Sequence, residues 1–112
     1  VALESDPGLA EQAQTLLRDL SNVKVRTGEL AAGVPADGPF DVILVNGAVE
    51  VMPHALLDQL KDGGRLAAIV VTNGVGKATL WRRYQMRFDQ RPLFDAGAPL
   101  LPGFARKAEF VF

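Results

Sequence analysis

The chain has 112 residues, of which 48% are hydrophobic and 22% charged, with a formal net charge of −1. This length and composition suit one domain with a packed core, and the balanced charge argues against a nucleic-acid surface. Because the sequence has no cysteine, a disulfide framework, a thiol nucleophile and a thiolate zinc site are excluded. The longest apolar run, residues 66–71, is too short to cross a membrane. We therefore expect a cytoplasmic protein.

The first third of the sequence predicts a strand, a helix and a second strand. Residues 1–3 are apolar, and Asp6 followed by Pro7 is typical of a helix N-cap and first helical position. Apolar residues then recur at helical spacing, at Leu9, Ala13, Leu16, Leu17 and Leu20. Residues 23–27 alternate between apolar and polar, which predicts a strand with one solvated face.

The middle of the chain predicts two buried strands joined by a helix. After a Gly/Pro-rich loop at residues 28–39, Phe40 to Asn46 form a strand whose continuous apolar centre is typical of a parallel sheet covered on both faces. Pro53 is expected to open a helix that Gly63-Gly64 ends, and residues 66–71 form the second buried strand. The order strand, helix, strand, strand, helix, strand indicates a parallel α/β sheet.

The last third has a different pattern. Asn73-Gly74 is a strong turn signal. Alternation from Leu80 to Phe88 predicts a single strand, and residues 108–112 predict a final β segment. The sequence therefore predicts a mostly parallel sheet with an antiparallel C-terminal edge.

Glu4 is the first candidate site residue, because it ends a strand directly before a helix. In nucleotide-binding α/β folds an acid in this place accepts hydrogen bonds from the ribose hydroxyls, and a glycine-rich loop lies about 20 residues upstream. Glu4 stands too early in this chain for such a loop, so a dinucleotide or adenosyl site would be half present. The alternative is a solvated loop acid.

Two further groups follow predicted strands. Gly28, Glu29 and Leu30 come after the second strand, where a polar residue can reach an adenine edge; a simple turn is the alternative. Asn46, Gly47 and Ala48 end the buried strand with small residues, which permit close approach of a ligand or substrate, with a tight strand-to-helix turn as the alternative. Because three neighbouring strand ends would line one crevice, we expect the last group to be functional.

Other motifs predict no site. Residues 74–79, GVGKAT, lack the first glycine and the Ser/Thr of a phosphate-binding loop. The sole histidine, His54, has no Ser or Cys partner at a readable spacing, so a surface role is expected. The aspartates show no metal-ligand pattern, and no metal site is predicted. Trp81 is expected in the core.

Several segments together resemble a known family: VALESDPGLAEQAQTLL, VKVRTGELAAG, GPFDVILVNGAVEVMPHALLDQLKDGGRLAAIVV and LFDAGAPLLPGFARKAEFVF. They are similar to the C-terminal portion of protein-L-isoaspartate O-methyltransferases, which use S-adenosyl-L-methionine. The densest match is PFDVILVNGAVEVMPHALLDQLKDGGRL. The resemblance covers essentially the whole chain but only about the latter half of a full-length enzyme of usual domain size.

The resemblance implies that residues 1–112 are the C-terminal portion of a single Rossmann-like methyltransferase domain. The first strand and the glycine-rich loop of the family pattern are absent. Site residues are carried over from the matching motifs. Glu4 matches the ribose-binding acid, Gly28, Glu29 and Leu30 match the loop beside adenine, and Asn46, Gly47 and Ala48 match the loop flanking the crevice of methyl donor and substrate.

The implied reaction is methyl transfer to the carboxylate of L-isoaspartyl residues, which begins the repair of damaged proteins. Its partners would be isoaspartyl peptides or proteins, with neither nucleic acid nor membrane. The S-adenosyl-L-methionine site is half present, so this chain alone is expected to be inactive. The alternatives are a noncatalytic or diverged methyltransferase-like binding module and the nucleotide-binding domain of a dehydrogenase.

The absent first strand has a structural consequence. The resemblance places it between the strands at residues 1–4 and 40–46. Two hydrophobic strand edges would then face a gap, and such edges tend to pair with each other or with another chain. We therefore expect either a closed-up sheet that joins these two strands or a strand-exchanged homodimer.

Overall fold

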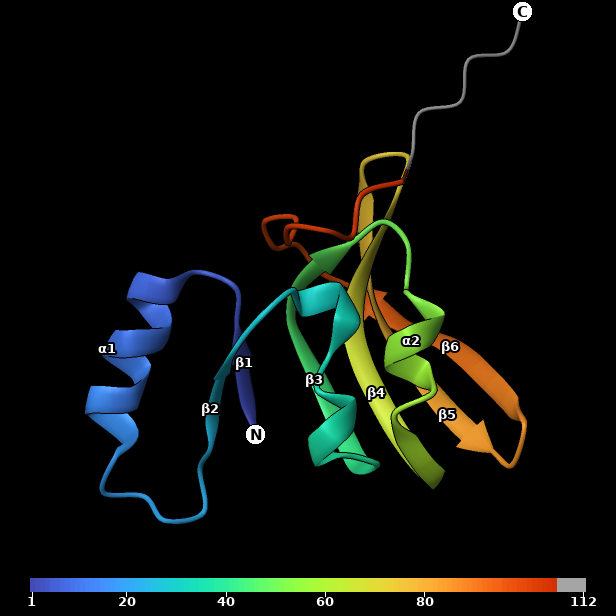
Figure 1. Cartoon of the computed structure of the whole chain (residues 1–112). Coiled ribbons are helices and arrows are strands. Elements are labelled where there is room, and N and C mark those ends of the chain that lie inside the picture. The colour runs from blue at the N-terminus through green and yellow to red at the C-terminus, as the bar shows by residue number, and fades with distance from the viewer. Residues whose placement is uncertain (107–112) are drawn as a thin grey trace, which may run out of the picture.

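The computed structural model describes residues 1–106, which form two sheets side by side (Figure 1). In the smaller sheet, β1 (Ala2–Glu4) pairs in parallel with β2 (Val25–Thr27), and α1 (Pro7–Leu17) connects them. The larger sheet has the strand order β3-β4-β5-β6, with β3 at Phe40–Val49, β4 at Leu60–Thr72, β5 at Val75–Tyr84 and β6 at Arg87–Asp95. Strands β1 to β4 run in the same direction in Figure 1, so the carboxyl ends of the strands in both sheets lie on the same side of the molecule.

The start of α1 confirms the predicted cap. Asp6 Oδ1 accepts hydrogen bonds from the backbone N–H groups of Gly8 at 2.8 Å and Leu9 at 3.2 Å. Pro7 occupies the first helical position, where it sacrifices no hydrogen bond. The apolar stripe of the helix is only weakly covered, because Ala10 is its buried residue and Leu16 is 79% exposed.

The core lies on one face of the larger sheet. The short helix α2 (His54–Leu57) covers this face, together with Phe104 from the C-terminal loop. The parallel pairing of β3 with β4 is as predicted. The expectation that β3 is covered on both faces is wrong, because Val42 is 60% and Leu44 72% exposed on the face opposite the core. The buried cluster consists of Val49, Leu56, Leu57, Leu60, Leu66, Ala68, Trp81 and Phe104.

The predicted extent of the second helix is wrong. The helix α2 ends at Leu57, and the fully buried Leu60 begins β4, where it pairs with Phe40 of β3. Gly64 therefore lies inside a strand, at an irregularity in the β3–β4 register. A Cβ on Gly64 would lie 2.8 Å from the Lys61 carbonyl oxygen. The glycine serves close backbone packing within the sheet and does not end a helix.

The predicted antiparallel edge is confirmed, since β4 pairs antiparallel with β5 and β5 with β6. Asn73-Gly74 forms the predicted turn, with φ of 51° and 79°. The single strand predicted over residues 80–88 is wrong, because the chain turns at Gln85, whose φ is 55°, and β6 begins at Arg87. The predicted β segment at residues 108–112 lies outside the described residues.

The predicted closed-up sheet is wrong, because β1 and β3 belong to separate sheets. Arg26 of β2 pairs with Asp37 at 2.9 Å, which ties the small sheet to the connecting segment. That segment contains the 3₁₀ turns η1 (Leu30–Ala32) and η2 (Pro35–Asp37). Gln59 fixes the segment to α2 through its side-chain amide. These contacts connect the smaller sheet to α2 through the segment between β2 and β3.

Candidate functional site

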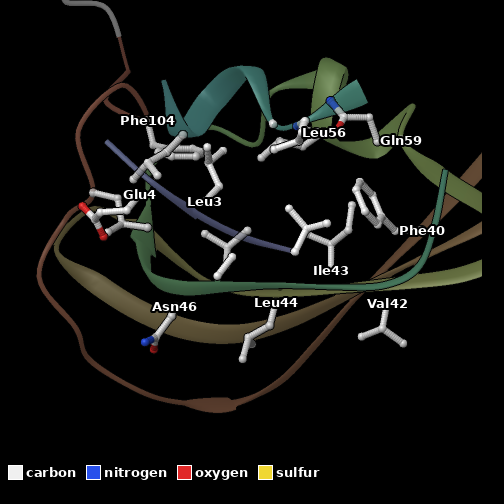
Figure 2. Close-up of a pocket in the computed structure, with 17 residues that line it drawn as sticks. Leu3, Glu4, Phe40, Val42, Ile43, Leu44, Asn46, Leu56, Gln59 and Phe104 are labelled. Carbon is white, nitrogen blue, oxygen red and sulfur yellow. Dashed lines mark hydrogen bonds between the residues drawn. The ribbon is translucent and has the colours of Figure 1, made fainter. Parts of the chain in front are cut away.

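A cavity of about 460 Å³ lies between β1 and β3. Apolar side chains from both strands, η1, α2 and the C-terminal loop form its walls. In Figure 2, Phe40 and Ile43 point to the same side of β3 as Leu56 and Phe104. Among the described residues that line the cavity, Glu4 is the one with an ionisable side chain. The cavity therefore has apolar walls and one acidic end.

Glu4 occupies the carboxyl end of β1, as predicted, and its side chain is partly buried. Its Oε1 accepts a hydrogen bond from the Asp6 N–H at 3.1 Å, and its other carboxylate oxygen has no hydrogen-bond partner within residues 1–106. The Gly28 N–H donates to the Glu4 carbonyl oxygen at 3.1 Å. Because β1 and β2 pair in parallel with Glu4 opposite Thr27, the structure brings two predicted site residues together.

The residues after Gly28 face different surroundings. Glu29 is exposed and precedes η1 without making a side-chain capping hydrogen bond. Leu30 is half-buried, packs against the core cluster and lines the cavity. Of this predicted group, Leu30 borders the cavity directly and Glu29 faces solvent at the same edge.

The prediction that Asn46 ends its strand is wrong, because β3 continues to Val49. Ala48 donates its N–H to the Pro99 carbonyl oxygen at 3.0 Å and accepts the Leu101 N–H at 2.9 Å. These partners from the C-terminal loop prolong β3 beyond the predicted end.

The three residues have different surroundings within β3. A Cβ on Gly47 would lie 2.5 Å from Leu101 Cγ, so this glycine makes room for Leu101. Ala48 is buried beneath the same loop, whereas Asn46 is exposed and lines the cavity. In Figure 2, Asn46 lies toward the same end of the cavity as Glu4. Asn46 is thus the member of this group that a ligand in the cavity could reach.

Gln59 is a residue that the sequence reading missed as part of this region. It is buried and lines the cavity. Its Nε2 donates to the carbonyl oxygens of Ala32 at 2.9 Å and Ala55 at 3.0 Å, and its Oε1 accepts the Val34 N–H at 3.0 Å. The partners at Ala32 and Val34 are distant in sequence, so no local pattern marks the role of Gln59.

The pairs Arg26–Asp37 and His54–Asp58 lie outside the cavity. The hydrogen bond from Arg26 lowers the pKa of Asp37 below its ordinary value and raises the pKa of Arg26. The exposed His54 pairs with Asp58 at 3.6 Å, which confirms its surface position.

Residues 1–106 contain no group of three His, Cys, Asp or Glu side chains placed to hold a metal ion. The same residues contain no helix that is long and apolar enough to span a membrane.

Comparison with protein families identifies the chain. The model of the protein-L-isoaspartate(D-aspartate) O-methyltransferase family matches residues 1–92. The chain belongs to this family. The resemblance read from the sequence is confirmed.

Curated relatives in the same family cover most of this chain. The protein-L-isoaspartate O-methyltransferase of Rhizobium meliloti is 38% identical over 93 residues, which are 82% of this chain and 45% of that protein. The enzyme of the same name from Methylorubrum populi is 40% identical over 105 residues, which are 91% of this chain and 50% of that protein. The chain thus spans about half the length of the curated relatives it matches.

Solved structures confirm the fold class. A protein-L-isoaspartate O-methyltransferase superposes with a TM-score of 0.79 at 24% identity, over 90% of this chain and 33% of that one. A Plasmodium falciparum protein described by the same activity, in complex with S-adenosyl-L-homocysteine, superposes with a TM-score of 0.69 at 19% identity. That match covers 88% of this chain and 50% of the other. The α/β methyltransferase fold, with parallel pairing of β1 with β2 and of β3 with β4 and an antiparallel edge, is therefore established.

Proposed function

We propose that this chain forms part of an S-adenosyl-L-methionine-dependent enzyme that methylates the carboxylate of L-isoaspartyl residues in damaged proteins. The observation that carries the proposal is the family match over residues 1–92. The carboxyl end of β1 supports it, because Glu4 lies there beside the Gly28 N–H and ligands of open α/β sheets bind outside the carboxyl ends of the strands. We propose further that the 112 residues alone do not catalyse the reaction.

The residues present fit the nucleoside portion of S-adenosyl-L-methionine. Glu4 offers a carboxylate oxygen without a partner in residues 1–106 to the two ribose hydroxyls. Gly28, Glu29 and Leu30 would border the adenine, and Asn46 would border the methyl-transfer crevice, whereas Leu101 fills the space beside Gly47 and Ala48 is buried. When bound, the cofactor supplies the methyl group. The role of this chain is to orient its nucleoside, and positioning is the main contribution expected in such a reaction.

The competing functions are not supported by the comparisons. The relatives and solved structures described above carry the methyltransferase name, and none of these is a dehydrogenase. A calorimetric titration separates the two ligand classes directly. We expect the chain to bind S-adenosyl-L-homocysteine in preference to NAD, and preference for NAD would contradict the proposal.

The role of Glu4 is tested by the variant Glu4→Gln, which keeps the shape and one oxygen but removes the charge. Hydrogen bonds to a charged group contribute about 1.5–3 kcal/mol, so Glu4→Gln should weaken S-adenosyl-L-homocysteine binding by about tenfold or more. Glu11→Gln is the matched control, because Glu11 is exposed on α1 and does not line the cavity. Equal weakening by both changes, or by neither, would contradict the assignment.

Catalysis is tested with a labelled methyl donor and an isoaspartyl peptide, with the corresponding aspartyl peptide as control. The 112-residue chain should transfer no label. A chimera that joins it to the N-terminal half of the Rhizobium meliloti relative should label only the isoaspartyl peptide. Transfer by the chain alone would disprove its inactivity. A folded chimera that binds S-adenosyl-L-homocysteine but labels neither peptide would disprove the substrate.

We also propose that the protein acts in the cytoplasm, which agrees with the absence of cysteine from its sequence. Two copies are proposed to associate through exposed sheet edges, since β1 and β3 each have one edge without a strand partner within residues 1–106. Sedimentation equilibrium should then show a concentration-dependent dimer. A strictly monomeric chain across the measured range would remove the dimer from the proposal.

A further inference from the structure

Two Asn-Gly pairs occur in the chain, at Asn46-Gly47 and at Asn73-Gly74. In such a pair the backbone nitrogen of the glycine can attack the side-chain amide carbon of the asparagine and close a five-membered succinimide ring. Glycine favours this reaction, because it has no Cβ to obstruct the approach and its backbone is the least restricted. The structure holds the two pairs in opposite surroundings.

The pair Asn73-Gly74 is open to this chemistry. It forms the exposed turn between β4 and β5 (Figure 1). Neither the Asn73 side chain nor the Gly74 N–H forms a hydrogen bond within residues 1–106. A Cβ placed on Gly74 would meet no atom within 4 Å, so the attacking nitrogen has free space beside it. Both reacting groups are therefore unrestrained.

The pair Asn46-Gly47 is held on two sides. It lies within β3, and a Cβ on Gly47 would lie 2.5 Å from Leu101 Cγ. The next residue, Ala48, is fixed by hydrogen bonds with Pro99 and Leu101 of the C-terminal loop. Rotation of the peptide between Asn46 and Gly47 toward the Asn46 side chain would break these contacts. Ring closure there therefore requires local opening of the sheet.

We propose that Asn73-Gly74 is a site of spontaneous deamidation that places an isoaspartyl residue in the turn between β4 and β5. The fold shields Asn46-Gly47 from the same reaction. In the first step the Gly74 nitrogen bonds to Asn73 Cγ, and the amide group leaves as ammonia with the proton of that nitrogen.

Water completes the reaction. It adds to the main-chain carbonyl carbon of residue 73, the bond from this carbon to the Gly74 nitrogen breaks, and the nitrogen keeps its new bond to Cγ. The chain then continues through Cγ, and the former main-chain carbonyl carbon carries a free carboxylate. Opening of the ring at Cγ instead gives an ordinary aspartyl residue, so both products form.

The two Asp-Gly pairs, at residues 37–38 and 62–63, are poorer candidates. A carboxylate is a weaker electrophile than an amide, and both carboxylates are engaged. Asp37 is bound by Arg26 at 2.9 Å, and Asp62 accepts the Gln85 N–H at 2.7 Å. Within residues 1–106, Asn73-Gly74 is therefore the pair best placed to react.

The product alters the turn. An isoaspartyl link adds one carbon atom to the main chain and puts a negative charge at an exposed tip. The two-residue turn depends on positive φ at Asn73 and Gly74, which the longer link does not preserve. Pairing of Thr72 with Val75 should therefore loosen. The product belongs to the class of group on which the enzyme proposed above acts, but its formation does not depend on that function.

Ageing of the folded 112-residue chain, followed by peptide mapping, tests the proposal. Mass spectrometry measures deamidation at both Asn-Gly pairs in the same molecule, and electron-transfer fragmentation distinguishes isoaspartyl from aspartyl products. Asn73 should deamidate at least about tenfold faster than Asn46, because Asn46 reacts only after local opening. The rate at Asn73 should be higher in mildly alkaline than in neutral buffer, because the attacking nitrogen must lose its proton.

Ageing in concentrated urea is the matched control, since both pairs then lack the protection of the fold and should react at similar rates. Gly74→Ala should slow the reaction at Asn73 in urea by about tenfold, because it adds a Cβ beside the nitrogen. Asn73→Asp suits the folded chain, because aspartate also tolerates the left-handed conformation of the turn. This variant should not show the rapid loss of ammonia.

Three results would overturn the proposal. The first is an Asn73 that survives in the folded chain as long as Asn46. The second is a rate difference that persists unchanged in urea, which would assign it to the flanking residues and not to the fold. The third is aspartate as the sole product at residue 73, which would show that no isoaspartyl residue forms there.

Discussion

The region of β1, α1 and β2 differs sharply from the sheet of β3 to β6. The first has Ala10 as its one buried apolar residue, whereas the second contains the fully buried Leu60, Leu66 and Val49. Yet the leading candidate ligand residue, Glu4, belongs to the first region. Elements that bind ligands are commonly drawn from the less stable parts of a fold. The comparison indicates that the larger sheet provides stability and that the smaller region provides much of the proposed nucleoside site.

The largest expected effect comes from matched leucine truncations in the two regions. Leu66→Ala removes a fully buried side chain from β4 and should lower the free energy of unfolding by about 2–5 kcal/mol. Leu16→Ala removes a side chain that is 79% exposed on α1, and its effect should stay within about 0.5 kcal/mol. Urea unfolding followed by Trp81 fluorescence measures the effect on the larger sheet, and hydrogen exchange in α1 measures the effect on the smaller region. Similar losses would contradict the difference between the regions.

The junction between the regions should be the next most sensitive place. Gln59→Leu removes three hydrogen bonds and leaves the Val34 N–H and the Ala32 carbonyl oxygen without their partner. The expected loss is about 1–3 kcal/mol, with faster hydrogen exchange at Val34. Gln12→Leu on the exposed surface of α1 is the control and should change neither quantity. Unchanged exchange at Val34 in Gln59→Leu would show that the amide does not hold the connecting segment.

The capping residue of α1 should have a smaller and more local effect. Asp6→Ala removes the acceptor for two backbone N–H groups and should cost the helix about 1 kcal/mol. Because α1 buries little, exchange should accelerate in α1 while the unfolding midpoint of the larger sheet stays constant. Asp6→Asn keeps an acceptor oxygen and should resemble the unaltered chain. A shift of the global midpoint would mean that the two regions unfold together.

The ion pair between Arg26 and Asp37 should have the smallest effect, and that effect should depend on pH. Arg26 lowers the pKa of Asp37 in the folded state, so the stabilisation is present above the ordinary carboxyl pKa. It is lost as pH falls through the lowered pKa, below about pH 4. The stability difference between the unaltered chain and Arg26→Met should therefore shrink in acid. A difference that grows in acid would have the wrong sign.

Elements with local signals could be predicted from the sequence. The Asp6-Pro7 cap and the Asn73-Gly74 turn depend on neighbouring atoms, and the continuous apolar run of residues 66–71 predicts a central strand, β4, whose Leu66 and Ala68 are buried. The turn at Gln85 could not be predicted in the same way, since alternation continues through it to Phe88 without a glycine or asparagine. Pairing of β5 with β6 decides it.

Long-range packing explains the other differences. Leu60 fits helical spacing, but its pairing with Phe40 places it in β4. Gly47 suggests a ligand-binding loop, but the space beside it is taken by Leu101. The location of Glu4 could be predicted, because an acid between a strand and a helix cap is a local pattern. That Glu4 and Asn46 line the same cavity could not be predicted, because they belong to different sheets.

Nuclear Overhauser effects across the strands test the central comparison most directly. In the free 112-residue chain, backbone protons should show contacts between β1 and β2 and between β3 and β4, in the parallel registers described above. No such contacts should join β1 to β3. Direct contacts of Leu3 with Ile43, together with slow amide exchange along both strands, would show that the sheets merge and would contradict the account.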